Sequence, residues 1–143
     1  MKHLRKFNEA REPWIDVDEL RDFCETNLAY LLDEGFEIDP NSHNSYIPPF
    51  YVKIYNVDER NERGHIRTYN TIEWDNIKDH FIPFISRLNT TYNIESNIFF
   101  VYQVNGRADM RSDFKRIGLD DILNDVVPNQ SFHTISIKLH KKK

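Results

Sequence analysis

Apolar residues recur at helical spacing between residues 71 and 92, and this pattern constrains the fold more strongly than any other feature of the chain. Residues three or four apart share one face of a helix, so the stripe predicts an amphipathic helix packed on a core. Thr71 is its expected N-cap. Pro83 lies inside the pattern and is expected to kink the helix or divide it in two. The stripe consists of Ile77, Phe81, Phe84, Ile85, Leu88 and Tyr92, with Trp74 nearby.

A second amphipathic helix is predicted from Asp16 to Glu34. Asp16 is a suitable N-cap, with Glu19 three residues further on, and Gly35 stands where a left-handed C-cap belongs. Cys24 lies on the apolar face, so we expect a buried, small hydrophobic residue rather than a nucleophile. That face is formed by Val17, Leu20, Phe23, Cys24, Leu28, Leu31 and Leu32.

Strand patterns surround the two helices. The apolar run at 98–104 predicts a central strand with both faces covered. Other segments are predicted as strands at 50–57, 65–70 and 131–139, a loop at 39–49, where prolines occur, and one or two helical turns at 119–126. The sequence therefore predicts an α+β domain, with two main helices packed on one face of a mainly antiparallel sheet of four to five strands.

Length and charge divide the chain into three parts. The 143 residues fit one domain, predicted at 16–139, with a basic extension at 1–15 and a basic tail at 140–143. The net charge is −4, but residues 12–137 alone carry a balance of −11 because both ends are basic. Phosphate contacts need clustered Lys and Arg, so nucleic-acid binding by this acidic body is not expected.

Several site motifs are absent from the sequence. The single cysteine provides neither a disulfide nor a cysteine metal site, and the four glycines form no phosphate-binding loop. Accordingly, no cofactor is expected. No secretory signal or membrane-spanning segment is visible, so the sequence predicts a cytoplasmic protein. His133 alternates with Ile135 and Ile137, which predicts a partly buried structural histidine.

Paired aspartates are the candidate metal ligands. Asp75 and Asp79 are four residues apart on the predicted helix at 71–92, and Asp109 and Asp113 have the same spacing further along the chain. Paired carboxylates hold the cations of phosphoryl-transfer enzymes and nucleases. Such pairs are also frequent on solvated surfaces, and here the surface interpretation is favoured.

Aromatic and basic residues are the candidate partner-binding groups. Tyr51, Tyr55 and Tyr69 are expected on one face of the predicted hairpin, where they would bind a partner, stack on bases or form an ordinary half-exposed sheet. The terminal Lys141, Lys142 and Lys143 would form either a partner surface or a frayed, solubilising end.

The opening segment MKHLRKFNEA and the segments at 23–36 and 74–79 resemble small uncharacterised proteins of large tailed bacteriophages. The scarcity of alanine beside abundant Asn, Ile, Lys, Tyr and Phe fits an AT-rich genome. The resemblance suggests a source and transfers no catalytic residue.

Three functions are compatible with these features. The favoured one is a non-enzymatic accessory or assembly protein that acts through protein–protein contact or self-association. The first alternative is a metal-dependent phosphoryl-transfer enzyme or nuclease that uses the paired aspartates. The second alternative is single-stranded nucleic-acid binding through the tyrosine face of the sheet.

Overall fold

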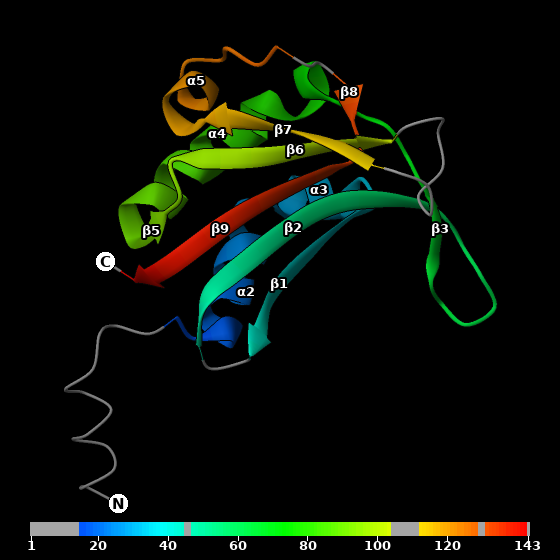
Figure 1. Cartoon of the computed structure of the whole chain (residues 1–143), viewed down its shortest axis with the longest axis horizontal. Helices are drawn as coiled ribbons and strands as arrows, with labels where there is room; N and C mark the ends of the chain where they lie inside the picture. The colour runs from blue at the N-terminus through cyan, green and yellow to red at the C-terminus, as the bar shows by residue number, and fades with distance from the viewer. Residues whose placement is uncertain (1–14, 45–46, 104–111, 129–130, 143) are drawn as a thin grey trace, which may run out of the picture.

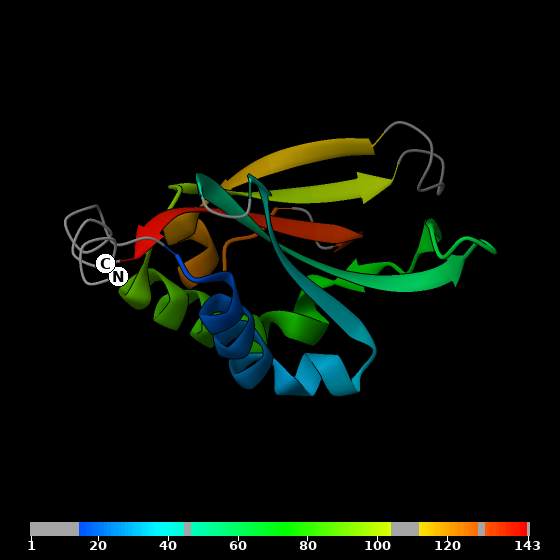
Figure 2. The ribbon, with the colours of Figure 1, turned by 90° about the horizontal axis from the view of Figure 1, so that it is seen from below.

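The computed structural model describes residues 15–44, 47–103, 112–128 and 131–142 (Figure 1). Helices gather on one side of a twisted sheet (Figure 2). In the described residues they are α2 (Val17–Asn27), α3 (Ala29–Asp33), α4 (Trp74–Thr91) and α5 (Leu119–Leu123). The predicted α+β class with a mainly antiparallel sheet is confirmed, although the sheet has seven strands rather than four to five.

Five strands lie side by side in the order β1, β2, β9, β6, β7. Their bounds are β1 (Phe36–Asn44), β2 (Ile47–Arg60), β9 (Thr134–Lys142), β6 (Asn97–Gln103) and β7 (Ser112–Gly118). Two further strands lie off this path: β3 (Ile66–Tyr69) pairs with β2, and β5 (Tyr92–Ile94) pairs with β9. A separate small pair is formed by β4 (Ile72–Glu73) and β8 (Ser131–Phe132).

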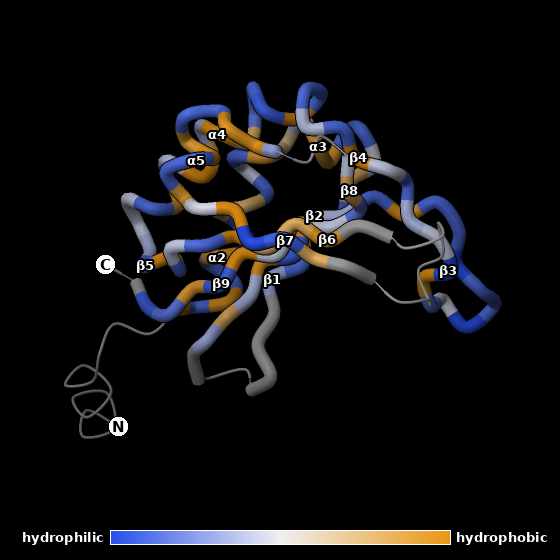
Figure 3. The backbone as a smooth tube through the Cα atoms, turned by 45° about the horizontal axis from the view of Figure 1, so that its top comes forward, coloured by the Kyte–Doolittle hydropathy of each residue, from blue (hydrophilic) through white to orange (hydrophobic). Residues whose placement is uncertain are grey.

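The middle strand is β9, which lies between β2 and β6 (Figure 1). The sheet has one buried face, covered by the helices, and one open face (Figure 2). Ile135 and Ile137 are fully buried toward the helices, and the paired Ile54 and Val52 of β2 are equally buried. Side chains alternate between the two faces of a strand, so the intervening residues belong to the opposite face. Hydrophobic segments concentrate in α4 and the sheet, whereas the tip of the β2–β3 hairpin is hydrophilic (Figure 3).

Strand β6 differs from the prediction in one respect. It lies inside the sheet, between β9 and β7, and Ile98 and Phe100 are fully buried. Phe99 and Val101, on its other face, are only partly buried. The expectation that both faces of this strand are covered is therefore wrong, because the helices lie on one side of the sheet.

The first predicted helix is divided at Leu28. Asp16 caps its start as predicted, since its Oδ1 accepts hydrogen bonds from the backbone N–H groups of Asp18 (2.9 Å) and Glu19 (3.2 Å). At the other end, Asn27 donates its side-chain amide to the carbonyl of Phe23 (2.8 Å), and Asn residues favour helix ends for this reason. Gly35 takes the expected left-handed conformation, with φ of 90°.

The long helix α4 begins later than predicted and is not divided. Residues 72–73 pair with β8, so Thr71 does not cap the helix. Pro83 lies on the exposed side of a single helix that continues to Thr91. Buried side chains on both sides of the proline, such as Phe81 and Phe84, explain why packing outweighs the hydrogen bond that proline removes.

The predicted loop at 39–49 is wrong, because β1 continues to Asn44 and β2 begins at Ile47. Pro40 pairs with Val52 in this ladder. β1 lies at the edge of the sheet, and proline is tolerated in edge strands because one side of the strand needs no hydrogen bonds. Pro40 therefore marks an edge strand rather than an interruption.

Parts of both basic segments predicted outside the domain, at 1–15 and 140–143, belong to the folded structure. Ile15, placed in the basic extension, is 5% exposed and belongs to the core. Lys141 and Lys142 continue β9, where they pair with Asn93 and Tyr92 of β5. The lysines at 141 and 142 are therefore held by a strand of the same chain, while residues 1–14 and Lys143 lie outside the described residues.

The two phenylalanines in the middle of β6 provide a direct test of the one-sided sheet. We expect Phe100→Ala to lower the free energy of unfolding by about 3–5 kcal/mol, because it opens a cavity in the core. Phe99→Ala removes the same atoms from the open face and should lower it by less than half as much. Urea unfolding curves with equal slopes measure both changes. Equal losses would contradict the assignment of the two faces.

Candidate functional site

An open cavity of about 560 Å³ lies on the face of the sheet that the helices leave uncovered. We call it the open-face cavity. Its charged lining residues are Asp39 and Lys53, and its other lining residues are Tyr55, Ile66, Tyr69, Phe99, Val101, Phe114, His133, Thr134 and Ser136. Pockets for small ligands or side chains have volumes of roughly 300–1,000 Å³ and a mostly apolar lining with a few polar groups.

The register of the antiparallel strands assembles this lining from distant parts of the chain. Directly paired residues place their side chains next to each other on one face. Two neighbouring rows cross the sheet in this way: Asp39, Lys53, Ser136, Phe99 and Arg116 form one, and Glu37, Tyr55, Thr134, Val101 and Phe114 form the other. The cavity therefore exists only when β1, β2, β9, β6 and β7 are all paired.

Two aromatic pairs flank the cavity. On one side, the ring centroids of Tyr55 and Tyr69 are 5.8 Å apart in an edge-to-face arrangement. On the other side, Phe99 and Phe114 are 5.5 Å apart, also edge to face. Such geometry is favourable because the positive edge of one ring meets the negative face of the other. These four side chains come from the strands β2, β3, β6 and β7.

His133 is a buried polar group in the lining. Its ring stacks on Tyr69, with centroids 4.5 Å apart and planes inclined by 16°. Nδ1 lies 2.7 Å from the hydroxyl of Thr134, while Nε2 is buried and has no hydrogen-bond partner among the described residues. The predicted burial of His133 is confirmed, at 6% exposure. Burial lowers the pKa of His133, which keeps the imidazole neutral at neutral pH.

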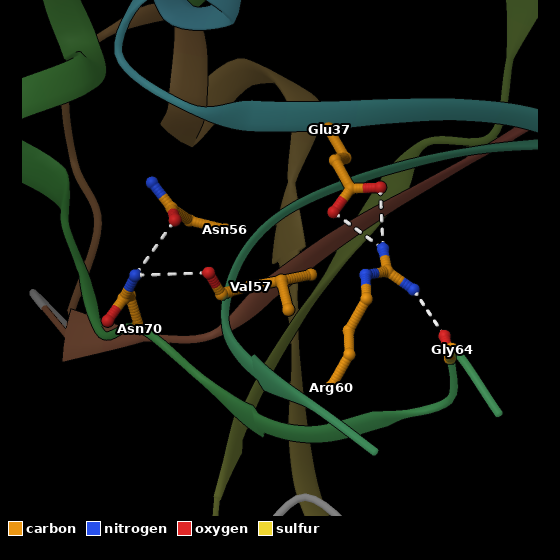
Figure 4. A network of polar contacts seen from close by, with 6 residues as sticks. All are labelled: Glu37, Asn56, Val57, Arg60, Gly64 and Asn70. Carbon is orange, nitrogen blue, oxygen red and sulfur yellow. Dashed lines mark hydrogen bonds and ion pairs between the residues drawn. The ribbon is translucent and has the colours of Figure 1, made fainter. Parts of the chain in front are cut away.

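An ion pair fastens the β2–β3 hairpin to the edge of the sheet. Nη2 of Arg60 donates to both carboxylate oxygens of Glu37 at 2.7 Å, and Nη1 donates to the carbonyl of Gly64 at 2.8 Å (Figure 4). The hydrogen bonds with Glu37 raise the pKa of Arg60. The contact joins the start of β1, the end of β2 and the hairpin turn.

Asn70, which directly follows β3, joins the end of that strand to β2. Its side-chain amide donates to Oδ1 of Asn56 at 2.9 Å and to the Val57 carbonyl at 3.4 Å (Figure 4). Its backbone N–H donates to the Asn56 carbonyl at 2.8 Å. Tyr69 directly precedes Asn70, so these bonds help to hold its ring against His133. Burial raises the pKa of Tyr69 and of Tyr55, and for Tyr55 the nearby Glu37 adds to the effect. Both hydroxyls are therefore protonated at neutral pH.

Two cations lie along the first row of the open face. Lys53 pairs across the strands with Asp39, and Arg116 lies over the ring of Phe99, with its guanidinium carbon 5.5 Å from the ring centroid. Both side chains are exposed, and within the described part of the chain neither forms an ion pair shorter than 4 Å. A cation over an aromatic face is attracted by the ring quadrupole.

The predicted metal ligands are not gathered at the open-face cavity. Asp75 is exposed on α4, where its carboxylate lies 3.5 Å from Nζ of Lys78, and Asp79 is exposed further along the helix. The backbone of Asp113 pairs with Tyr102, and Asp109 lies outside the described residues. Within the described ranges, no three His, Cys, Asp or Glu side chains come together to bind a metal ion.

The predicted partner-binding tyrosines are divided by the structure. Tyr55 and Tyr69 meet at the cavity, whereas Tyr51 pairs with Lys138 further along β2 and does not line it. Sequence reasoning missed Phe99, assigned to a strand covered on both faces, and Phe114, in a segment without a clear pattern. The alternation of Phe99 and Val101 with buried neighbours was the available signal for an open face.

Comparisons with known proteins do not extend this description. No protein-family model, no curated protein and no solved structure matches the chain. Among the described residues, none of the helices combines the length and the apolar character needed to cross a bilayer. The function is therefore inferred from the geometry of the site itself.

The neutral state of His133 predicts an acid-sensitive contribution to stability. The unfolded chain binds a proton at an ordinary histidine pKa of 6.5, whereas folded His133 resists protonation. The fold should therefore lose stability as the pH falls through about 6.5, by at most about 1.4 kcal/mol per pH unit, and the loss should stop below the folded-state pKa.

The variant His133→Phe keeps an aromatic ring beside Tyr69 but cannot titrate. Urea unfolding of both proteins at pH 7.5 and 5.5 measures the difference, and the wild type should lose more stability than the variant between these values. An identical pH dependence of the two proteins would show that His133 is not held neutral by the fold.

Proposed function

We propose that this chain is a non-enzymatic accessory or assembly protein that binds a partner protein through the open face of its sheet. The observation that carries the proposal is the open-face cavity, which brings four aromatic side chains from four strands around one apolar space. Aromatic residues are enriched in the buried centres of protein interfaces, where they provide large contact area at a small loss of conformational freedom.

The surroundings of the cavity support this function. Phe114 is 58% exposed beside it, so the apolar surface continues beyond the cavity itself. Charged residues of both signs, Asp39, Lys53 and Arg116, belong to the same row of the sheet. An apolar centre with a charged surround is the usual composition of a specific protein interface.

Single-stranded nucleic-acid binding is the second candidate. The stacking of Tyr69 on His133 favours it, because the open-face cavity already accommodates parallel planar rings. The net charge of −4 opposes it, since a phosphate backbone requires several clustered cations. The metal-dependent enzyme and the bacteriophage source stay predictions.

Site-specific photo-cross-linking tests whether the open face is the interface. A photoreactive benzoylphenylalanine at position 114 lies beside the open-face cavity, whereas the same group at position 30 lies on α3, in the helical layer. Phe114 and Tyr30 have similar exposure, 58% and 51%, so the two positions form a matched pair. Irradiation in cells that encode the chain, followed by mass spectrometry, identifies the adducts.

We expect one partner protein to be linked from position 114 and not from position 30, because only the first position faces the cavity. A partner linked only from position 30, or from neither position, would contradict the proposal. Linkage of position 114 to a second copy of the chain would identify self-association as the form of binding.

A further inference from the structure

We propose that the open-face cavity binds an aromatic side chain from an acidic segment of the partner protein, with a neighbouring carboxylate of that segment paired to Lys53. This inference rests on the proposed function and specifies the chemistry of the partner. It follows from three observations: aromatic rings flank the cavity, Lys53 in its lining makes no ion pair shorter than 4 Å with another described residue, and few further cations of the described chain are available.

The rings define a slot for another planar group. Tyr69 lies almost parallel to the His133 ring at a centroid distance of 4.5 Å, which shows that flat rings stack at this position. Phe99 and Phe114 present a second aromatic pair from the other side of the cavity, on the same face of the sheet. A cavity of about 560 Å³ with aromatic groups on both sides suits an inserted ring, because aromatic pairs are favourable in both stacked and edge-to-face arrangements.

The cations provide a place for an anion next to that ring. Lys53 lines the cavity and is exposed, and it makes no ion pair shorter than 4 Å within the described ranges. Arg116 lies at the other end of the same row, over Phe99. An anionic group beside the inserted ring would therefore meet Lys53, which is the cation in the cavity lining, while Arg116 lies over Phe99.

The number of available cations favours carboxylates over a phosphate chain. Arg60 is occupied by Glu37, and Lys138 lies 3.8 Å from Glu95, so these two cations are already neutralised by side chains of the same protein. Asp39, paired across the strands with Lys53, would repel a dense run of phosphates. An isolated carboxylate needs one cation, whereas a nucleic-acid backbone needs several.

A short acidic peptide tests the inference. The probe is an N-acetylated, C-amidated peptide, Ser-Gly-Asp-Trp-Gly-Gly-Ser, which places one carboxylate beside the tryptophan and is titrated into the full-length protein labelled with ¹⁵N. The matched probe has leucine in place of tryptophan, and a twelve-residue oligothymidine provides the nucleic-acid arm. We expect saturable shifts of the amide signals of Val101, Thr134 and Tyr69 with the tryptophan peptide, and binding about tenfold weaker with the leucine peptide.

Charge reversal locates the anion contact. Lys53→Glu should weaken binding of the tryptophan peptide by about tenfold or more, because attraction becomes repulsion. Arg21→Glu makes the same charge change on the exposed side of α2, away from the open face, and should leave the affinity within about twofold. The amide spectra of both variants confirm that they are folded.

Three results would overturn the inference: no saturable shift at millimolar peptide, equal affinity of both peptides, or no effect of Lys53→Glu. Tighter binding of oligothymidine at the same amides would replace it with the nucleic-acid function. If the peptide fails while position 114 still cross-links to a partner protein, only this inference is lost. If both experiments fail, the proposed function fails with it.

Discussion

The pairing of β9 with strands on both sides is the constraint on which the rest of the structure depends. β9 is the last strand in the sequence, yet it lies between β2 and β6 and joins the two halves of the sheet. Its alternation places Ile135, Ile137 and Leu139 in the core and Thr134 and Ser136 at the open-face cavity. A shift of one residue in this register would exchange the two sets, so core and site are determined by the same hydrogen bonds.

One-sided packing by the helices leaves the other face of the sheet open, and this is the face that we propose binds a partner. The helical layer buries one face of the sheet, and the other face is bounded by the β2–β3 hairpin and by the β6–β7 pair (Figure 2). The Arg60–Glu37 ion pair and the Asn70–Asn56 hydrogen bonds hold the hairpin in place. They stabilise an aromatic cavity, whose lining comes from six strands and from His133 just before β9. Rigid support of this kind reduces the ordering that binding would otherwise require.

The sequence was informative where local periodicity and burial agree. The stripe from Ile77 to Leu88 predicted α4, and the alternation around Val52 and Ile54 predicted β2. Prolines misled the assignment of β1, because their tolerance depends on lying at a sheet edge, which is a tertiary property. The cavity was out of reach for a similar reason: Tyr55, Phe99 and Phe114 meet only through strand pairing, and no local pattern specifies which strands are neighbours.

The central claim, that one face of β6 and β9 is open while the other is dry, is tested most directly by methyl NMR with a soluble nitroxide. The methyl signals of Val101, on the open face, should broaden strongly, whereas those of Ile135 and Ile137 should be protected by the helical layer. All three residues lie in the middle of the sheet, so a difference in broadening reports which face a side chain lies on and not its distance from the sheet edge. Equal protection of Val101 and the two isoleucines would contradict the account.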